Sequence, residues 1–290
     1  MISTIVKDMN FSKTLGAVSI RGRLKTFERP QIMAILNVTP DSFFDGGRYH
    51  RIEEALRRAE RALQEGADWI DVGGYSSRPG AADIEVPEEM RRVLPVVEAL
   101  KKEYGEAICL SADTFRVEVA GAALEAGADM INDISGGNEA MWRLVARHRV
   151  PYVMMHMRGT PQNMQQLTDY PEGVTLEVAR FFSERMAQCR ACGVHDVILD
   201  PGFGFAKTLQ QNYELLRNLS WLAQFNAPIL VGVSRKSMIY KALGVTPAEA
   251  LNGTTALNCM ALYAGASILR VHDVKEAKEI VTLLEHLKSS

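Results

Sequence analysis

Short apolar runs alternate with amphipathic segments along the chain after residue 31. The runs are nearly continuous in apolar character and rich in β-branched residues, which is typical of strands buried on both faces of a parallel sheet. The intervening segments repeat apolar residues at helical spacing. We expect strands at residues 32–37, 69–73, 107–113, 130–134, 151–156, 197–200, 229–234 and 267–271. We expect helices at residues 51–66, 87–103, 115–126, 138–148, 172–192, 209–224, 247–264 and 273–288.

This alternation predicts the fold class. Eight strand–helix units in a chain of 290 residues match an α/β fold of the (β/α)8 TIM-barrel type. The alternative is a doubly wound open sheet, which usually carries a glycine-rich phosphate-binding turn after its first strand. The segment from Asn37 to Pro40 is not such a turn. Since no linker or low-complexity segment divides the sequence, we expect residues 1–290 to form a single domain.

Residues 1–30 do not join the repeat. Polar and apolar residues alternate between Phe11 and Phe27, and Gly16 and Gly22 are turn signals. We therefore expect an N-terminal hairpin that caps the amino-terminal end of the barrel.

Polar side chains lie just past the apolar run of almost every predicted strand. They are Asn37, Asp71, Asp113, Asn132, Asp133, Asp200, Lys236, Arg270 and His272. Active sites of TIM barrels lie at the carboxyl ends of the strands, so these side chains are expected to converge. A single Asp or Asn at such a place often only caps the next helix. Lys236, Arg270 and His272 have no such role, which favours one site built from many loops.

Composition narrows the class of protein. The net charge of −2 makes nucleic acid an unexpected partner. We expect no membrane contact, because no apolar stretch approaches the roughly 20 residues of a membrane helix. The first residues lack the apolar core of a signal peptide, which indicates a cytoplasmic protein. Cys189 and Cys192 form a lone CxxC pair inside a predicted helix, and helix packing explains them better than a metal site.

Eight stretches give the chain a family resemblance. In order, they are MAILNVTPDSFFDGG (33–47), DVGGYSSRPGA (71–81), SADTFRVEVA (111–120), INDISGG (131–137), VMMHMRGTPQNMQ (153–165), ILDPGFGFAKT (198–208), VGVSRKSMI (231–239) and RVHDV (270–274). Together they resemble the dihydropteroate synthases, pterin-binding TIM-barrel enzymes of folate biosynthesis. The resemblance implies a transferase that joins 4-aminobenzoate to 6-hydroxymethyl-7,8-dihydropterin diphosphate, releasing 7,8-dihydropteroate and diphosphate. It also implies Mg2+ as cofactor, a homodimer and sensitivity to sulfonamides.

The resemblance assigns a pterin pocket. A pterin presents an edge of alternating donors and acceptors, which buried carboxylates and amides can recognise. Asp113, Asn132 and Asp200 match the family's contacts to that edge. Lys236 is expected at the pterin carbonyl and beside Asp200. Met155 and Met157 would pack on the ring, although ordinary barrel core is an open alternative for both.

The leaving diphosphate needs cations and donors. By resemblance these are Asn37, Arg78, Arg270 and His272, with Asn37 also a contact to Mg2+. A salt bridge to Asp273 is the structural alternative for Arg270 and His272. We expect a dissociative substitution without a covalent nucleophile. The expected catalytic residues are Asp113, Lys236, Arg270, His272 and Asp41, with Asp113 and Asp41 stabilising a cationic pterin methylene.

The 4-aminobenzoate pocket is also implied by the resemblance. Its expected residues are Phe43, Ser77, Arg78, Pro79, Phe205 and Ser237. The family more often has Glu, Thr and Gly where this chain has Tyr75, Ser77 and Ala206. Ser77 keeps a hydroxyl, and Tyr75 is expected to affect loop motion. The helix over 247–264 carries small and apolar residues that suit either a dimer face or barrel packing.

Three alternative functions remain open on the residues alone. A pterin-binding methyltransferase acting on a corrinoid would share the acidic pterin set but would not need Arg270, His272 or the loop at 77–79. A Schiff-base aldolase would need a depressed pKa at Lys236, which its charged neighbourhood does not suggest. Two long loops rich in Gly, Pro and Ser lie at residues 37–47 and 73–81. A catalytically silent pterin binder should have lost one of them, and this sequence keeps both.

Overall fold

The strands of the barrel begin at Gln31. The computed structural model describes residues 16–39, 48–78 and 80–289. The barrel strands are β3 (Gln31–Asn37), β4 (Trp69–Gly73), β5 (Leu110–Asp113), β6 (Met130–Asp133), β7 (Tyr152–Met155), β8 (Val197–Asp200), β9 (Leu230–Val231) and β10 (Ile268–Val271). They form a parallel sheet in the order β8-β7-β6-β5-β4-β3-β10-β9. An isolated bridge between Leu199 and Ile229 joins the outer strands, so the barrel is nearly closed.

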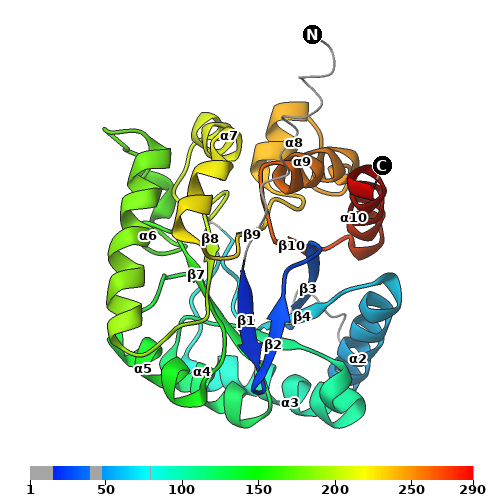
Figure 1. The fold of residues 1–290 in the computed structure, drawn as a ribbon. Helices are drawn as coiled ribbons and strands as arrows, with labels where there is room; N and C mark the ends of the chain where they lie inside the picture. The colour runs from blue at the N-terminus through cyan, green and yellow to red at the C-terminus, as the bar shows by residue number, and fades with distance from the viewer. Residues whose placement is uncertain (1–15, 40–47, 79, 290) are drawn as a thin grey trace.

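Helices surround the strands (Figure 1). They are α2 (Arg48–Glu65), α3 (Val86–Tyr104), α4 (Val117–Glu125), α5 (Glu139–His148), α6 (Val174–Ala191), α7 (Leu209–Arg217), α8 (Ser237–Leu243), α9 (Leu251–Tyr263) and α10 (Val274–Ser289). The apolar side chains between helices and strands form one continuous core. The predicted TIM barrel is confirmed, and the ring closure excludes an open doubly wound sheet. Among the described residues, no helix is long and apolar enough to span a membrane.

Some element boundaries differ from the sequence expectation. β9 is two residues long instead of six, because the chain leaves the sheet after Val231 and turns through Arg235, whose φ is 53°. The helix expected over 209–224 is α7 followed by a 3-10 helix, η4 (Leu219–Phe225), with the break at Asn218. The short helix α8 was not expected at all. These differences all lie in the last third of the barrel.

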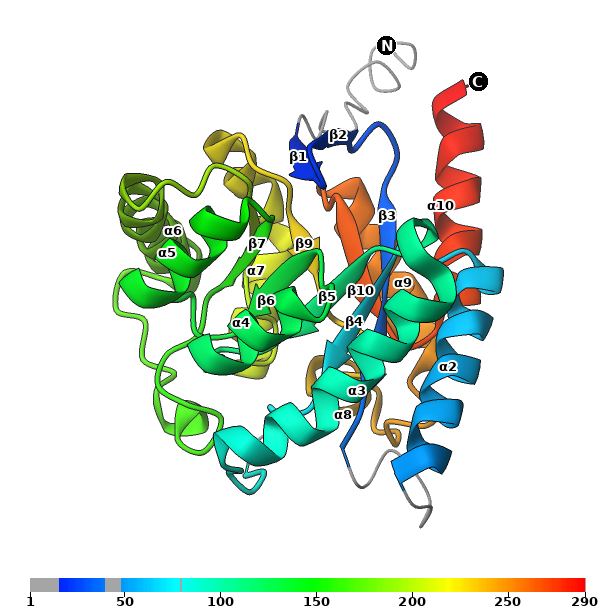
Figure 2. The same ribbon diagram turned by 90° about the horizontal axis from the view of Figure 1, so that it is seen from below.

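The expected N-terminal hairpin is present in the described residues as β1 (Ala17–Ile20) paired antiparallel with β2 (Arg23–Thr26). Arg21 and Gly22 form the turn with φ of 51° and 73°, the backbone that a two-residue hairpin loop prefers. Val18 and Ile20 belong to one buried apolar cluster with Phe27, Trp69 and the first residues of other barrel strands. The hairpin lies at the end of the barrel away from the start of α3 (Figure 2).

An ion pair fastens this hairpin to the barrel. The guanidinium of Arg21 donates to both carboxylate oxygens of Asp129, at 2.7 and 2.5 Å. The same guanidinium donates to the carbonyls of Glu106 and Ile108. Asp129 is 6% exposed and also accepts the backbone N–H of Leu110, the first residue of β5. One buried carboxylate therefore ties the turn to the edge of a core strand.

The substitution Arg21→Ala tests this attachment. Removing the guanidinium leaves the Asp129 carboxylate buried without its main partner, so we expect the free energy of unfolding to fall by about 2–4 kcal/mol. Arg23→Ala is the matched control, because Arg23 lies 3.8 Å from Glu106 and is largely exposed. We expect the control to change stability by less than about 1 kcal/mol. Equal losses in the two variants, measured by urea unfolding, would contradict the attachment.

Candidate functional site

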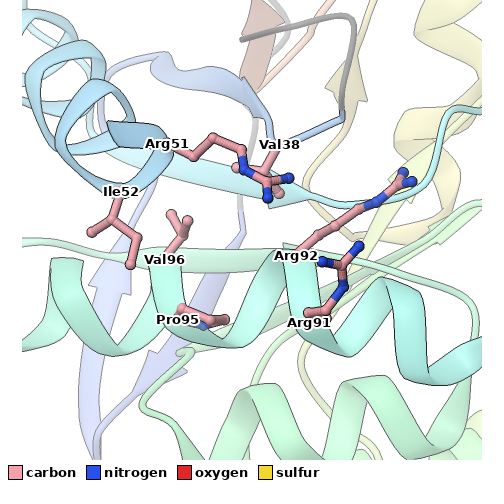
Figure 3. A pocket seen from close by; sticks show the side chains of 7 residues that line it. All are labelled: Val38, Arg51, Ile52, Arg91, Arg92, Pro95 and Val96. Atoms are coloured by element: carbon pink, nitrogen blue, oxygen red, sulfur yellow. The ribbon is translucent and has the colours of Figure 1, made fainter. Parts of the chain in front are cut away.

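A cleft of about 980 Å3 opens at the carboxyl ends of the strands. Its wall includes Asn37 at the end of β3, the segment 75–78 after β4 and the segment 203–205 after β8. It also includes the segment 234–237 after β9, Arg270 on β10 and His272 directly after β10. A second pocket, of about 200 Å3, lies outside the barrel between α2 and α3 (Figure 3). Small-molecule sites generally have several hundred Å3. The large cleft is therefore the candidate functional site.

One side chain of the second pocket is connected to the cleft. Figure 3 shows Arg51 from α2 and Arg91 and Arg92 from α3 around it. Arg92 donates to the carbonyl of Gly74 at 3.0 Å and to Glu88 at 2.6 Å. The side chain thus ties α3 to the beginning of the loop after β4.

Asp71, on β4, is the centre of the network at the base of the cleft. Its side chain is 0% exposed, and its Oδ2 accepts from Arg270 Nε at 2.7 Å and from Asn132 Nδ2 at 2.9 Å. The other nitrogen of the fork, Arg270 Nη2, donates to Asp113 Oδ2 at 2.6 Å. Asp71 Oδ1 is buried and has no hydrogen-bond partner among the described residues. Four strands, β4, β5, β6 and β10, thus place their polar side chains in one connected group.

Burial and charge oppose each other in this group. Burial raises the pKa of Asp113 to about 7; Arg270 opposes the shift and the charge of Asp71 adds to it. Burial by itself would lower the pKa of Arg270, but the charges of Asp71 and Asp113 outweigh it and raise that pKa. Arg270 therefore stays charged, while Asp113 gains or loses its proton near neutral pH.

Lys236 lies on the other side of the cleft base, at the N-cap of α8. Its ammonium donates to the carbonyl of Phe203 at 2.7 Å and lies 4.8 Å from the ring centre of Phe205. Burial lowers the pKa of Lys236 to about 8, with Asp200 opposing the shift. The expectation from sequence that the pKa of Lys236 is not depressed is therefore wrong. Asp200, 5% exposed, accepts the backbone N–H of Gly202 at 2.7 Å, and burial raises its pKa.

Arg235 and His272 complete this side of the cleft. Arg235 forms a bidentate ion pair with Asp273, at 2.9 and 2.8 Å, so Asp273 is the partner of Arg235 and not of Arg270. The alternative role suggested for Arg270 from sequence is thereby excluded. The imidazole of His272 is exposed to the cleft. Desolvation, with the charge of Arg270 second, lowers the pKa of His272 to about 4, so the ring is neutral at pH 7.

The loop after β4 is held by aromatic and charged contacts. The hydroxyl of Tyr75 accepts from Gln162 Nε2 at 2.8 Å, and its ring meets Phe115 edge-on with centroids 5.2 Å apart. The guanidinium of Arg116 lies 5.3 Å from the Tyr75 ring centre and binds the buried carboxylate of Glu89 at 2.9 Å. Tyr75 therefore links this loop to those after β5 and β7.

The site residues predicted from the sequence fall into three groups: those that line the cleft, those buried at its base, and those in an apolar cluster beside it. Asn37, Ser77, Arg78, Asp113, Phe205, Lys236, Ser237, Arg270 and His272 line the cleft. Asn132 and Asp200 are buried at its base. Met155 and Met157 pack in an apolar cluster with Phe205, and Met164 lines the cleft there instead. Asp41, Phe43 and Pro79 lie outside the described residues.

Several residues of the site received no role from the sequence. Asp71 was recognised only as a polar strand end, although an aspartate within the buried strand WIDVG is itself a signal. Lys207 and His156 form a buried pair, with Nζ 3.0 Å from Nδ1. Their partners are distant in sequence, so spacing alone does not reveal the pair. Gln162 gave no sequence signal.

Comparisons with known proteins agree with this geometry. A family model described as pterin binding enzyme matches residues 33–272. A dihydropteroate synthase from Synechocystis is 46% identical over 265 residues, covering 90% of this chain and 91% of the relative. The structure of Yersinia pestis dihydropteroate synthase in a sulfonamide drug complex has a TM-score of 0.88 at 43% identity, covering 94% of this chain and 100% of that chain. The Xanthomonas albilineans enzyme with 4-aminobenzoic acid has a TM-score of 0.87 at 40% identity, covering 94% and 98%.

The raised pKa of Asp113 has a measurable consequence. Between about pH 4 and pH 7, an aspartate ionises in the unfolded chain, whereas Asp113 stays protonated in the folded protein. The stability linked to this group is therefore present at low pH and is lost as the pH rises through about 7. We expect the stability advantage of Asp113→Asn over the wild type to grow in this range, by at most about 1.4 kcal/mol per pH unit.

Chemical unfolding at several values from pH 4 to pH 8 measures this slope. Asp83→Asn serves as the control, because the Asp83 side chain is 68% exposed. A constant difference between the wild type and Asp113→Asn across this range would show that the pKa of Asp113 is not raised.

Proposed function

The chain belongs to the pterin-binding enzymes and, among them, to the dihydropteroate synthase family, and we propose that the cleft residues carry out its condensation reaction. The reaction joins 6-hydroxymethyl-7,8-dihydropterin diphosphate to 4-aminobenzoate and gives 7,8-dihydropteroate and diphosphate. The observation that carries the assignment of residues is the buried network of Asp71, Arg270, Asn132 and Asp113. In this network Asn132 and Asp113 can recognise the edge of a pterin. Both are connected to Arg270, whose positive charge suits the leaving diphosphate.

The pterin binds at the base of the cleft. Asp113, Asn132 and Asp200 offer oxygens and an amide to its edge, and all three sit on strands that hold them rigidly. Lys236 meets the carbonyl side of the ring and offsets the charge of Asp200. Arg270 donates to Asp113, so a pterin that binds Asp113 competes with that contact. Asp71 keeps hold of Arg270 during this exchange.

The released Arg270 fork then faces the diphosphate, with His272 and Arg78 on the same cleft wall. Departure of diphosphate leaves positive charge on the pterin methylene, which the Asp113 carboxylate stabilises. The amine of 4-aminobenzoate attacks the methylene, and Ser77, Arg78, Phe205 and Ser237 form the described part of its pocket. In this proposal the pterin diphosphate binds first and 4-aminobenzoate second. No covalent enzyme intermediate is needed.

Mg2+ is proposed as the cofactor. No group of three or more acidic, histidine or cysteine side chains suited to a metal occurs among the described residues. The donors present instead fit Mg2+ shared with the substrate, because Asn37 lines the same cleft as Arg270 and Mg2+ accepts one protein oxygen together with phosphate oxygens and water. Asn37 would hold the ion, which supplies charge neutralisation for the leaving diphosphate.

A direct assay tests the function. We expect the purified protein, given the pterin diphosphate and Mg2+, to release diphosphate only when 4-aminobenzoate is present, with an equal amount of dihydropteroate. Arg270→Lys should lower kcat about 100-fold or more, because a lysine cannot hold both carboxylates and the diphosphate. The surface variant Arg91→Lys is the control and should keep full activity. Pterin binding without diphosphate release under any condition would overturn the assignment and favour the silent binder or the methyltransferase.

We further propose that the chain forms a homodimer and works in the cytoplasm. Met260 on α9 and Leu283 on α10 are 57% and 70% exposed, and these two helices pack together. Buried Ala261 and Leu262 show that the opposite side of α9 serves the barrel. All four cysteines are free thiols, which fits a reducing compartment.

The proposed dimer surface is tested by the double variant Met260→Asp, Leu283→Asp. Sedimentation velocity should show about twice the chain mass of 32.1 kDa for the wild type and the single mass for the double variant. A charge placed in an apolar interface is costly, which is why the dimer should separate. Leu24→Asp is the control, because Leu24 is 73% exposed on the hairpin. A wild type that sediments as a monomer at micromolar concentration would refute the proposal.

A further inference from the structure

The loop from Pro201 to Thr208, between β8 and α7, forms one wall of the cleft. The carbonyl of Phe203 accepts from Lys236, and the ring of Phe205 lies 4.8 Å from the same ammonium. Phe203, Gly204 and Phe205 all line the cleft. The position of this loop therefore sets both the anchor of Lys236 and the aromatic surface beside it.

The loop adopts a backbone that requires support from its surroundings. Gly202 has φ of +71°, and a Cβ atom there would lie 2.0 Å from the carbonyl oxygen of His156. Ala206 is a buried alanine with φ of +49°, in the left-handed region that disfavours side chains. Such conformations persist only where neighbouring groups hold them in place.

Lys207 provides that support. Its side chain is 4% exposed, and Nζ donates to the carbonyls of Gly202 at 2.9 Å and Phe205 at 3.0 Å. Nζ also lies 3.0 Å from Nδ1 of His156, which follows β7. Burial lowers the pKa of His156 well below its ordinary value, so the ring is neutral and Nδ1 can accept.

The ammonium is costly at this place. Burial lowers the pKa of Lys207 to about 7, with Asp200 opposing the shift. Among the described residues no carboxylate lies within ion-pair distance of Lys207, so its hydrogen bonds go to the loop and to His156. An apolar side chain of similar length would avoid the desolvation penalty but could not bind two loop carbonyls. In return for this desolvation penalty, the two hydrogen bonds hold the loop backbone in place.

We propose that Lys207 is a positioning residue for the condensation, holding the 201–208 loop so that the Phe205 ring forms a wall of the 4-aminobenzoate pocket. The inference rests on the proposed function of the cleft. Asp113 and Asn132 lie on β5 and β6, and Asp200 ends β8, so the strands position these three groups. The loop reaches the proposed pterin groups through the Gly202 N–H and the Phe203 carbonyl, whereas the whole Phe205 ring belongs to the loop itself. Loss of Lys207 therefore weakens use of the amine much more than binding of the pterin.

Two variants test the role of Lys207. In Lys207→Met the KM for 4-aminobenzoate should rise about tenfold, equivalent to about 1.4 kcal/mol, while the Kd for the pterin diphosphate stays within about threefold. Lys207→Gln can donate to the two carbonyls and should recover most of the wild-type KM. Val145→Ala, in the core side of α5, is the control for general destabilisation and should lower Tm without changing KM.

Parallel increases in KM and in the pterin Kd, or a lower Tm with unchanged KM, would overturn the positioning role. A second measurement needs no turnover: the affinity of a sulfonamide for the protein loaded with pterin diphosphate reports on the same 4-aminobenzoate pocket. It should fall in Lys207→Met and recover in Lys207→Gln. If the wild type makes no dihydropteroate, the proposed function fails, whereas an unchanged sulfonamide affinity in an active Lys207→Met refutes only the role of Lys207.

Discussion

The buried carboxylate of Asp71 is the constraint on which the site depends. One of its oxygens receives both Arg270 and Asn132, and Arg270 extends from there to Asp113. A fully buried carboxylate is costly unless charged or hydrogen-bonding partners satisfy it. Asp71 therefore fixes the orientation of one side chain from β10 and another from β6. The pterin pocket and the leaving-group site that we propose are joined through this single group.

The same network explains how a highly charged substrate can enter a closed polar cluster. Arg270 contacts two carboxylates without substrate, and Asp113 has a pKa raised to about 7 by burial. Exchanging the Asp113 contact for a diphosphate costs little when the second carboxylate, Asp71, keeps the guanidinium in place. On the other side of the cleft, Lys236 is held by the Phe203 carbonyl in a similar way. Both cations are thus positioned before the substrate arrives, which is the condition for electrostatic stabilisation of developing charge.

Much of this arrangement was predictable from the sequence, because two strong patterns agree. Buried apolar runs predicted the strands, and the polar residues that end these runs, such as Asn132 and Arg270, lie at one end of the barrel. The early end of β9 and the helix α8 were not predicted, because the left-handed turn at Arg235 depends on its tertiary contacts with Asp273 and Thr254. The lowered pKa of Lys236 was missed for a related reason. Burial is a property of the folded cleft, whereas the sequence shows only charged neighbours.

The roles of individual side chains were the hardest to anticipate. Met155 and Met157 flank His156 in sequence and pack in one apolar cluster with Phe205 and Met164, and of these four residues Phe205 and Met164 line the cleft. The contacts of Tyr75 with Gln162 and Phe115 join loops that are far apart in the chain. Asp71 could be read as an ordinary strand residue until its partners on β6 and β10 were visible. Such assignments need three-dimensional neighbours.

The most direct test of this account is a single-turnover measurement of diphosphate release by Asp71→Asn, with the pterin diphosphate, Mg2+ and 4-aminobenzoate at saturation. An amide cannot hold the Arg270 guanidinium as a carboxylate does, so we predict release about 100-fold slower than in the wild type, with the fold retained. Asp68→Asn is the matched control, because Asp68 pairs with Arg29 at 2.5 Å outside the cleft and should not affect release. Release at the wild-type rate from a folded Asp71→Asn would contradict the claim that this carboxylate organises the site.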